Sequence, residues 1–220
     1  APFVLYLRTL APTINNLDSA ELPTAAATCG LVRATLYPLY LLIGRVWSLL
    51  PIGDVGYRMN LLSAVCGALT VALGERILRR LGVGVWARLA ALGLLAVAQF
   101  FWALALIAEV YTLHTAILAG VILALLRWAE QPAPGRLALA TFLMGIGFGN
   151  HVATVLAAPG CLWFVLSTEP RKALATRSLG LAAAGLAAGL AVYLYLPLIY
   201  WTKPAFNYVG WFTADGVFEP

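Results

Sequence analysis

Apolar runs of roughly the length of a membrane-spanning helix follow one another along almost the whole chain. A helix needs about 20 apolar residues to cross the hydrocarbon core of a bilayer. Charged residues make up only 10% of the 220, whereas a soluble domain carries roughly 25%. The sequence therefore predicts an all-α polytopic membrane protein with about seven transmembrane helices. The runs lie at residues 1–12, 59–78, 85–108, 111–128, 137–149, 152–166 and 179–201.

The two ends of the chain and one shorter run complete this organisation. Residues 1–12 are the tail of a first span, so we expect the N-terminus to be incomplete. Residues 36–51 are too short to cross comfortably and carry Arg45 in their middle. We predict that this run is a helix lying in the membrane interface. It would sit within an outer loop at 13–58 of a single domain, 1–220, whose outer tail is 202–220.

The charges support this topology. With 36–51 in the interface, one side of the membrane collects nine basic residues against three acids. Counting 36–51 as a span would divide the basic clusters between both faces. Because positive charge marks the cytoplasmic side, we expect the acidic first loop to face the periplasm or cell exterior. The basic residues sit at the ends of apolar runs, so they indicate topology and predict no nucleic-acid partner. The nine are Arg76, Arg79, Arg80, Arg88, Arg127, Arg136, Arg171, Lys172 and Arg177.

The outer side holds the candidate catalytic carboxylates. Asp18 and Glu21 are three residues apart, which places both on one face of a helix. The same spacing fits an N-terminal capping box, and the two roles are compatible. Glu109 lies at the boundary between two spans, where an ionisable group is costly unless it is hydrated or faces a cavity. Two histidines, three distant cysteines and scattered acids form no metal motif, so no metal is predicted.

Cations on the same side offer a site for a phosphate group. Guanidinium groups bind phosphate oxygens in a bidentate way, which makes Arg33 and Arg58 candidates. Each could equally anchor the chain in the interface, and that role suits Arg45 better. His151 follows Asn150 between two short apolar runs, where the pair could also be a plain polar turn.

Several motifs in order resemble one known family. They are LYLRTLAPTINNLDSAEL at 5–22, the segment at 37–73, IAEVYTLHT at 107–115, GFGNH at 147–151 and YLYLPL at 193–198. The chain is similar to a bacterial integral-membrane family related to protein O-mannosyltransferases, within the GT-C glycosyltransferase superfamily. The resemblance implies a GT-C-like fold in the bacterial inner (plasma) membrane and contact with membrane lipids.

The resemblance also implies a reaction. GT-C enzymes use a polyprenyl-phosphate sugar as a donor substrate, with no certain cofactor. Asp18 would be the general base that activates a protein or glycan hydroxyl on the outer side, and Glu21 would orient it. Glu109 and Tyr111 would line the donor site, and His151 and Arg58 would lie near the phosphate.

Two departures from the family pattern keep a second function open. Ala20 stands where the family's D-S-G-E pattern has glycine. The family's H-P-x-G-Y-P reads R-A-T-L-Y-P at residues 33–38, so its His, first Pro and Gly are absent. The alternative is an inactive GT-C homologue that serves as a structural or accessory subunit of a larger membrane complex. A transporter is a weaker third reading, because no internal repeat marks a midplane site.

Overall fold

The structure is a computed structural model that describes residues 2–14, 18–32 and 37–207. Regular secondary structure in these residues is helical, and one isolated bridge pairs Leu31 with Asn207. The all-α class is therefore confirmed. The helices are α1 (Pro2–Thr9), α2 (Asp18–Thr28), α3 (Pro38–Ser48), α4 (Val55–Arg80), α5 (Val85–Val97), α6 (Gln99–Leu106), α7 (Tyr111–Glu130), α8 (Pro134–Asn150), η1 (Val152–Ala157), α9 (Ala158–Thr168), α10 (Pro170–Ala173), α11 (Thr176–Leu190), η2 (Ala191–Leu194) and α12 (Tyr195–Trp201).

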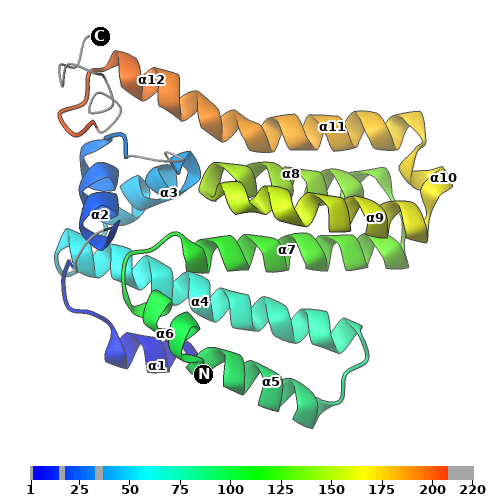
Figure 1. The fold of residues 1–220 in the computed structure, drawn as a ribbon, viewed down its shortest axis with the longest axis horizontal. Coiled ribbons are helices and arrows are strands. Elements are labelled where there is room, and N and C mark those ends of the chain that lie inside the picture. Colours follow the sequence, from blue (N-terminus) through cyan, green and yellow to red (C-terminus); the bar gives the residue numbers. More distant parts are fainter. Residues whose placement is uncertain (1, 15–17, 33–36, 208–220) are drawn as a thin grey trace.

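The long helices lie side by side and their connections gather at two opposite ends (Figure 1). Helix α7 packs between α4 and α8, and α11 packs on the other side of α8. At one end lie α2, α3, α12 and the connection from α6 to α7; we call this the acidic end. At the other end lie α10 and the turns after α4 and α7; we call it the basic end, because the nine basic residues counted above belong to its helix termini. Which end faces the cytoplasm stays a prediction.

Three helices are long and apolar enough to cross a membrane. They are α4, α7 and the continuous segment Thr176–Trp201, which comprises α11, η2 and α12. The bent pair α5–α6 makes a fourth if it counts as one span. Other apolar helices within the described chain are shorter. Helix α1 has 8 residues, α8 has 17, and the segment Val152–Thr168 also has 17. The expected number of about seven spans therefore stays a prediction.

The run at 85–108 forms a bent pair of helices, α5 and α6, and its crossing as one span stays a prediction. It breaks at Ala98, where the backbone is extended (φ −60°, ψ 128°), and the two parts meet at 58°. Helix α6 turns so that it packs against α1 and α4. The buried Tyr6 of α1 donates a hydrogen bond to the Ala96 carbonyl beside the break (3.0 Å). Trp102 Nε1 likewise donates to the Thr9 hydroxyl (3.1 Å).

Helix α3 corresponds to the run expected in the interface. Its 11 residues reach only about 16 Å, against about 30 Å of hydrocarbon core, so α3 cannot cross alone. Pro38 occupies its first position, where a missing N–H costs nothing. Tyr40 and Leu41 are fully buried against the bundle, whereas Val46 is 71% exposed. The one-sided burial is compatible with an interfacial helix, whose placement relative to a bilayer stays a prediction.

Small residues bring α8 and α11 into close contact, as the Gly/Ala pattern of residues 179–192 predicts. A Cβ added at Gly145 would lie 2.7 Å from the Leu186 carbonyl oxygen and 2.9 Å from Gly189 Cα. Thr141 Oγ1 of α8 donates to the Ala182 carbonyl of α11 (2.7 Å). The two backbones are therefore close enough to exclude larger side chains at these positions.

A pair of glycine substitutions on α11 tests this packing. A Cβ at Gly185 would lie 2.8 Å from Thr141 Oγ1 and closer still to the Ala138 carbonyl, whereas one at Gly180 meets nothing within 4 Å. Gly185→Ala should lower the free energy of unfolding by about 1–3 kcal/mol through overpacking. Gly180→Ala should leave it unchanged or raise it by up to about 1 kcal/mol, because alanine favours the helix. Unfolding in detergent measures both, and equal effects would contradict the close contact.

Candidate functional site

The connection between α6 and α7, residues 107–110, lies at the centre of the acidic end. It is not helical, so its backbone groups need partners from outside the loop. The Ser63 hydroxyl of α4 accepts a hydrogen bond from the Glu109 N–H (3.3 Å) and lies 3.4 Å from the Glu109 carbonyl oxygen, to which it donates. The fully buried Asn150, at the end of α8, donates from Nδ2 to the Val110 carbonyl (3.1 Å). Side chains of α4 and α8 thus hold the backbone that carries Glu109.

Helix α2 contacts the same loop. The Ser19 hydroxyl, 1% exposed, donates to the Ala108 carbonyl (3.2 Å). This bond places the start of α2, where Asp18 is the first helical residue, beside the 107–110 loop. The structure therefore brings together the two stretches that carry the predicted carboxylates.

The predicted carboxylates differ in what the structure shows of them. Glu21 is 9% exposed on α2, and Glu109 is half-buried in the loop. The backbone of Asp18 is helical, but its side chain lies outside the described part of the structure. Helical spacing of Asp18 and Glu21 is confirmed by α2, while the catalytic and capping roles both stay predictions.

His151 is the centre of a ring cluster beside this loop. Its ring centroid lies 5.2 Å from that of His114, 5.6 Å from Tyr111 and 6.0 Å from Tyr37. These residues come from the start of α7, the end of α8 and the residue before α3. The cluster therefore joins Tyr111 and His151, two predicted substrate-binding residues, in one place.

The protonation of His151 follows from its surroundings. Its Nδ1 accepts a hydrogen bond from the Ala153 N–H (3.1 Å), so the neutral ring carries its proton on Nε2. Burial lowers the pKa of His151, which keeps the ring neutral near pH 7. His151 therefore offers one N–H donor to a bound ligand.

Tyr40 adds a second buried polar group near the loop. It is fully buried on α3, and burial raises the pKa of its hydroxyl, with smaller contributions from Cys66 and Glu109. The hydroxyl stays protonated at any physiological pH. It is thus a neutral group next to the Glu109 carboxylate.

Arg58 is held by its own loop. Its guanidinium donates to three backbone carbonyls, those of Ser48, Ile52 (2.7 Å) and Gly53 (2.9 Å). These contacts close the turn before α4 and leave Arg58 fewer free N–H groups for a ligand. Arg33, the other predicted phosphate-binding arginine, lies outside the described residues.

Asp54 caps α4 at the same turn. Its carboxylate accepts hydrogen bonds from the Thr13 hydroxyl and from the Tyr57 N–H (2.7 Å). The Thr13 bond, followed by the Tyr57 bond, holds the pKa of Asp54 below its usual range. Asp54 is therefore an acid with a defined structural role at the acidic end.

The sequence analysis did not single out Ser19 or Ser63, and it read Asn150 as an element of a turn. All three are buried polar side chains that bond the backbone of the 107–110 loop. Ser63 lies inside a strongly apolar run, and an isolated polar residue in such a run needs a partner. That signal identifies a hydrogen bond but not the carbonyl that receives it.

The arrangement offers carboxylates and neutral N–H and O–H donors at one end of the bundle. In the part of the chain that the structure describes, no group of three or more His, Cys, Asp or Glu side chains could hold a metal ion, and all three cysteines are free. Proton transfer by a carboxylate and hydrogen bonding to an anionic or sugar ligand are the chemistry that these groups can provide.

Comparison with known proteins places this arrangement in a family. Residues 18–174 match the family described as the N-terminal domain of protein O-mannosyl-transferase TMEM260. The mouse protein O-mannosyl-transferase TMEM260 is 29% identical over 201 residues, which cover 88% of this chain but only 28% of that relative. No solved structure matches. The matched residues span most of the bundle and include the 107–110 loop, and the chain therefore belongs to the TMEM260 N-terminal domain family of O-mannosyltransferase-like membrane proteins.

Proposed function

We propose that the chain is the membrane domain of a glycosyltransferase of the GT-C type, which transfers mannose from a polyprenyl-phosphate donor to a hydroxyl acceptor. Its active site lies at the acidic end, which faces the periplasm or exterior of a bacterial inner membrane. The observation that carries the proposal is the contact of α2 with the 107–110 loop through Ser19 and Ala108, because it brings together the two distant segments to which the acids belong. The family match supports the reaction type.

In this mechanism Asp18 is the general base. It accepts the proton of the acceptor hydroxyl while that oxygen attacks C1 of the sugar. The bond from C1 to the phosphate oxygen breaks, the polyprenyl phosphate leaves with the electron pair, and the configuration at C1 inverts. Glu21, one helical turn away and 9% exposed, orients the acceptor.

The donor phosphate needs hydrogen-bond donors that remain available. The Nε2–H of His151 is one, because Nδ1 is already engaged by Ala153. Arg33 supplies positive charge from the segment between α2 and α3. Arg58 contributes charge without a bidentate contact, since three carbonyls occupy its guanidinium. Tyr111 and Glu109 line the space next to His151 and contact the sugar.

The first test compares two acids at the same end. Asp18→Asn removes the base with little change in shape and should lower transfer about 10²–10⁴-fold. Asp54→Asn is the matched control, because asparagine also caps a helix well and Asp54 serves α4. The assay measures transfer of labelled mannose from mannosyl-phosphoryl polyprenol to a Ser/Thr peptide by the full-length protein in vesicles.

Two outcomes of this assay would contradict the proposal. If Asp18→Asn retains the wild-type rate, Asp18 is not the base. If the wild-type protein itself transfers no sugar, the alternative of a non-catalytic membrane subunit is supported, in keeping with Ala20 and the altered motif at residues 33–38.

A second test concerns the loop. Ser63→Ala removes the hydroxyl that bonds both the N–H and the carbonyl of Glu109, which should cost about 0.5–1.5 kcal/mol of stability and lower transfer by loosening Glu109 and Tyr111. Ser178→Ala, which removes a buried serine on α11 at the basic end, serves as the control. Kinetics and thermal unfolding of both variants measure the two effects, and unchanged kinetics in Ser63→Ala would exclude a role for the loop in transfer.

A further inference from the structure

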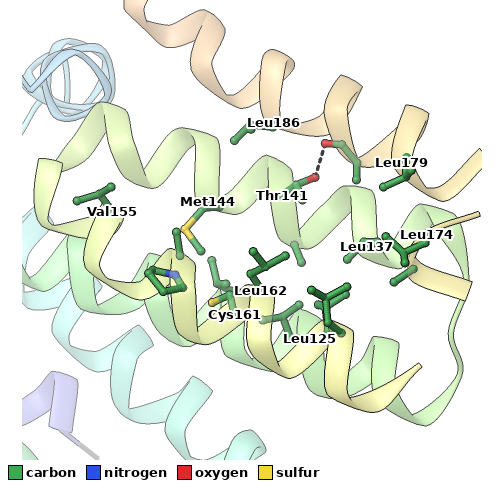
Figure 2. A pocket seen from close by; sticks show the side chains of 18 of the residues that line it. Leu125, Leu137, Thr141, Met144, Val155, Cys161, Leu162, Leu174, Leu179 and Leu186 are labelled. Carbon is green, nitrogen blue, oxygen red and sulfur yellow. Dashed lines mark hydrogen bonds between the residues drawn. The ribbon is translucent and has the colours of Figure 1, made fainter. Parts of the chain in front are cut away.

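A large apolar cavity of about 650 Å³ lies between α7, α8, α9 and α11 (Figure 2). Its polar lining is slight: the Thr141 hydroxyl already donates to the Ala182 carbonyl, and Cys161 is a free thiol. The remaining lining side chains labelled in Figure 2 are apolar, namely leucines together with Met144 and Val155.

The cavity reaches the outer surface of the bundle. Among its lining residues Leu162 is 59% exposed, Leu174 57% and Leu179 50%. In a membrane such a surface meets hydrocarbon, and water gains no hydrogen bonds in a space with this lining. The chemistry of the cavity therefore selects an alkyl chain as its occupant.

One end of the cavity lies at the basic end of the bundle. Leu174 and Leu179 line this end, and Figure 2 shows them beside Leu137 and far from Val155. Arg171 and Lys172, on α10, are three and two residues before Leu174, and Arg177, in the first turn of α11, is two residues before Leu179. Three cations are therefore sequence neighbours of the residues that line this end of the cavity.

Two of these cations are not engaged within the described chain. Lys172 pairs with Glu169 (3.3 Å). Arg171 and Arg177 are exposed and have no ion-pair partner among the described residues. Two exposed guanidinium groups at the basic end are therefore available to an anion.

We propose that this cavity is a binding site for an anionic phospholipid of the surrounding bilayer, whose phosphate group contacts Arg171 and Arg177 and whose acyl chain enters between α8, α9 and α11. Basic residues next to apolar space between membrane helices have this specificity because a zwitterionic headgroup brings no net negative charge. The site lies at the end opposite the candidate active site, so it does not depend on the proposed transfer reaction.

The experiment measures lipid retention by the full-length protein purified from nanodiscs that contain phosphatidylcholine and phosphatidylglycerol in a 4:1 ratio, a composition of roughly one anionic lipid in five. Native mass spectrometry counts the retained lipids, and thermal unfolding is followed as each lipid is added. The wild-type protein should retain phosphatidylglycerol in preference. Arg171→Gln with Arg177→Gln should weaken that preference by about fivefold for each cation, or roughly twenty-five-fold together. Arg76→Gln with Arg79→Gln, at the same end on α4, removes equal charge and should leave it intact.

A second pair of variants tests the acyl chain. Cys161→Phe fills the cavity from α9 and should abolish retention of the lipid, whereas Gly160→Phe adds a ring where a Cβ meets nothing within 4 Å and should have no effect. Equal retention of both lipids by the wild type, equal loss in the two arginine pairs, or unchanged retention in Cys161→Phe would each overturn the proposal. Recovery of a polyprenyl phosphate that Cys161→Phe displaces would also overturn it. Mannosyl transfer by the same samples separates this result from the fate of the proposed function.

Discussion

The structure depends on the pairing of backbone groups wherever a helix is interrupted in apolar surroundings. Water is absent from the hydrocarbon core, so an unpaired N–H or carbonyl there costs several kcal/mol. At the break beside Ala98, the Tyr6 hydroxyl bonds the Ala96 carbonyl. At the 107–110 loop, side chains from α2, α4 and α8 serve the same purpose. Side-chain hydrogen bonds therefore determine where the chain can leave the helical conformation.

This constraint has a consequence for the candidate site. A loop whose backbone is bonded from three helices has few alternative conformations, so the positions of Glu109 and Tyr111 are set by the bundle. Groups held in place before a ligand binds need no reorganisation during a reaction. The same bonds connect the loop to α2, so the geometry of the two acid-bearing segments is coupled. The helices thus act as the rigid support on which the polar residues of the acidic end are placed.

The sequence predicts the helices well because their signal is local. The apolar runs correspond to α4, α7 and Thr176–Trp201, and the small residues after 179 correctly predict close packing. The break at Ala98 has no local signal, since neither glycine nor proline stands at that residue, and it depends on α6 packing against α1 and α4. The 3-10 segment η2, before α12, does have a local signal in the sequence. Pro197 lacks the N–H that would bond the carbonyl of residue 193 in a regular α-helix.

Less of the candidate site can be predicted from the sequence, because most of its contacts are not local. The spacing of Asp18 and Glu21 predicts one helix face, and α2 provides it. The contacts that build the site join residues far apart in the sequence. In the ring cluster, His151 is 37 positions from His114 and 40 from Tyr111. Ser19 is 89 positions from Ala108, whose carbonyl it bonds. No local pattern encodes such contacts. The predicted phosphate role of Arg58 is limited for a different reason, because three carbonyls from the neighbouring turn at 48–53 engage its guanidinium.

Among the described residues, the basic end of the bundle has ion pairs between Arg80 and Glu130, between Arg88 and Glu75 and between Lys172 and Glu169. The three acids expected on this side are each used once, while nine basic residues lie there. Positive charge is therefore in excess at the basic end after pairing. An excess of cations at a bilayer surface is stabilised by anionic headgroups and orients the protein in the membrane, so one charge pattern serves both topology and lipid contact.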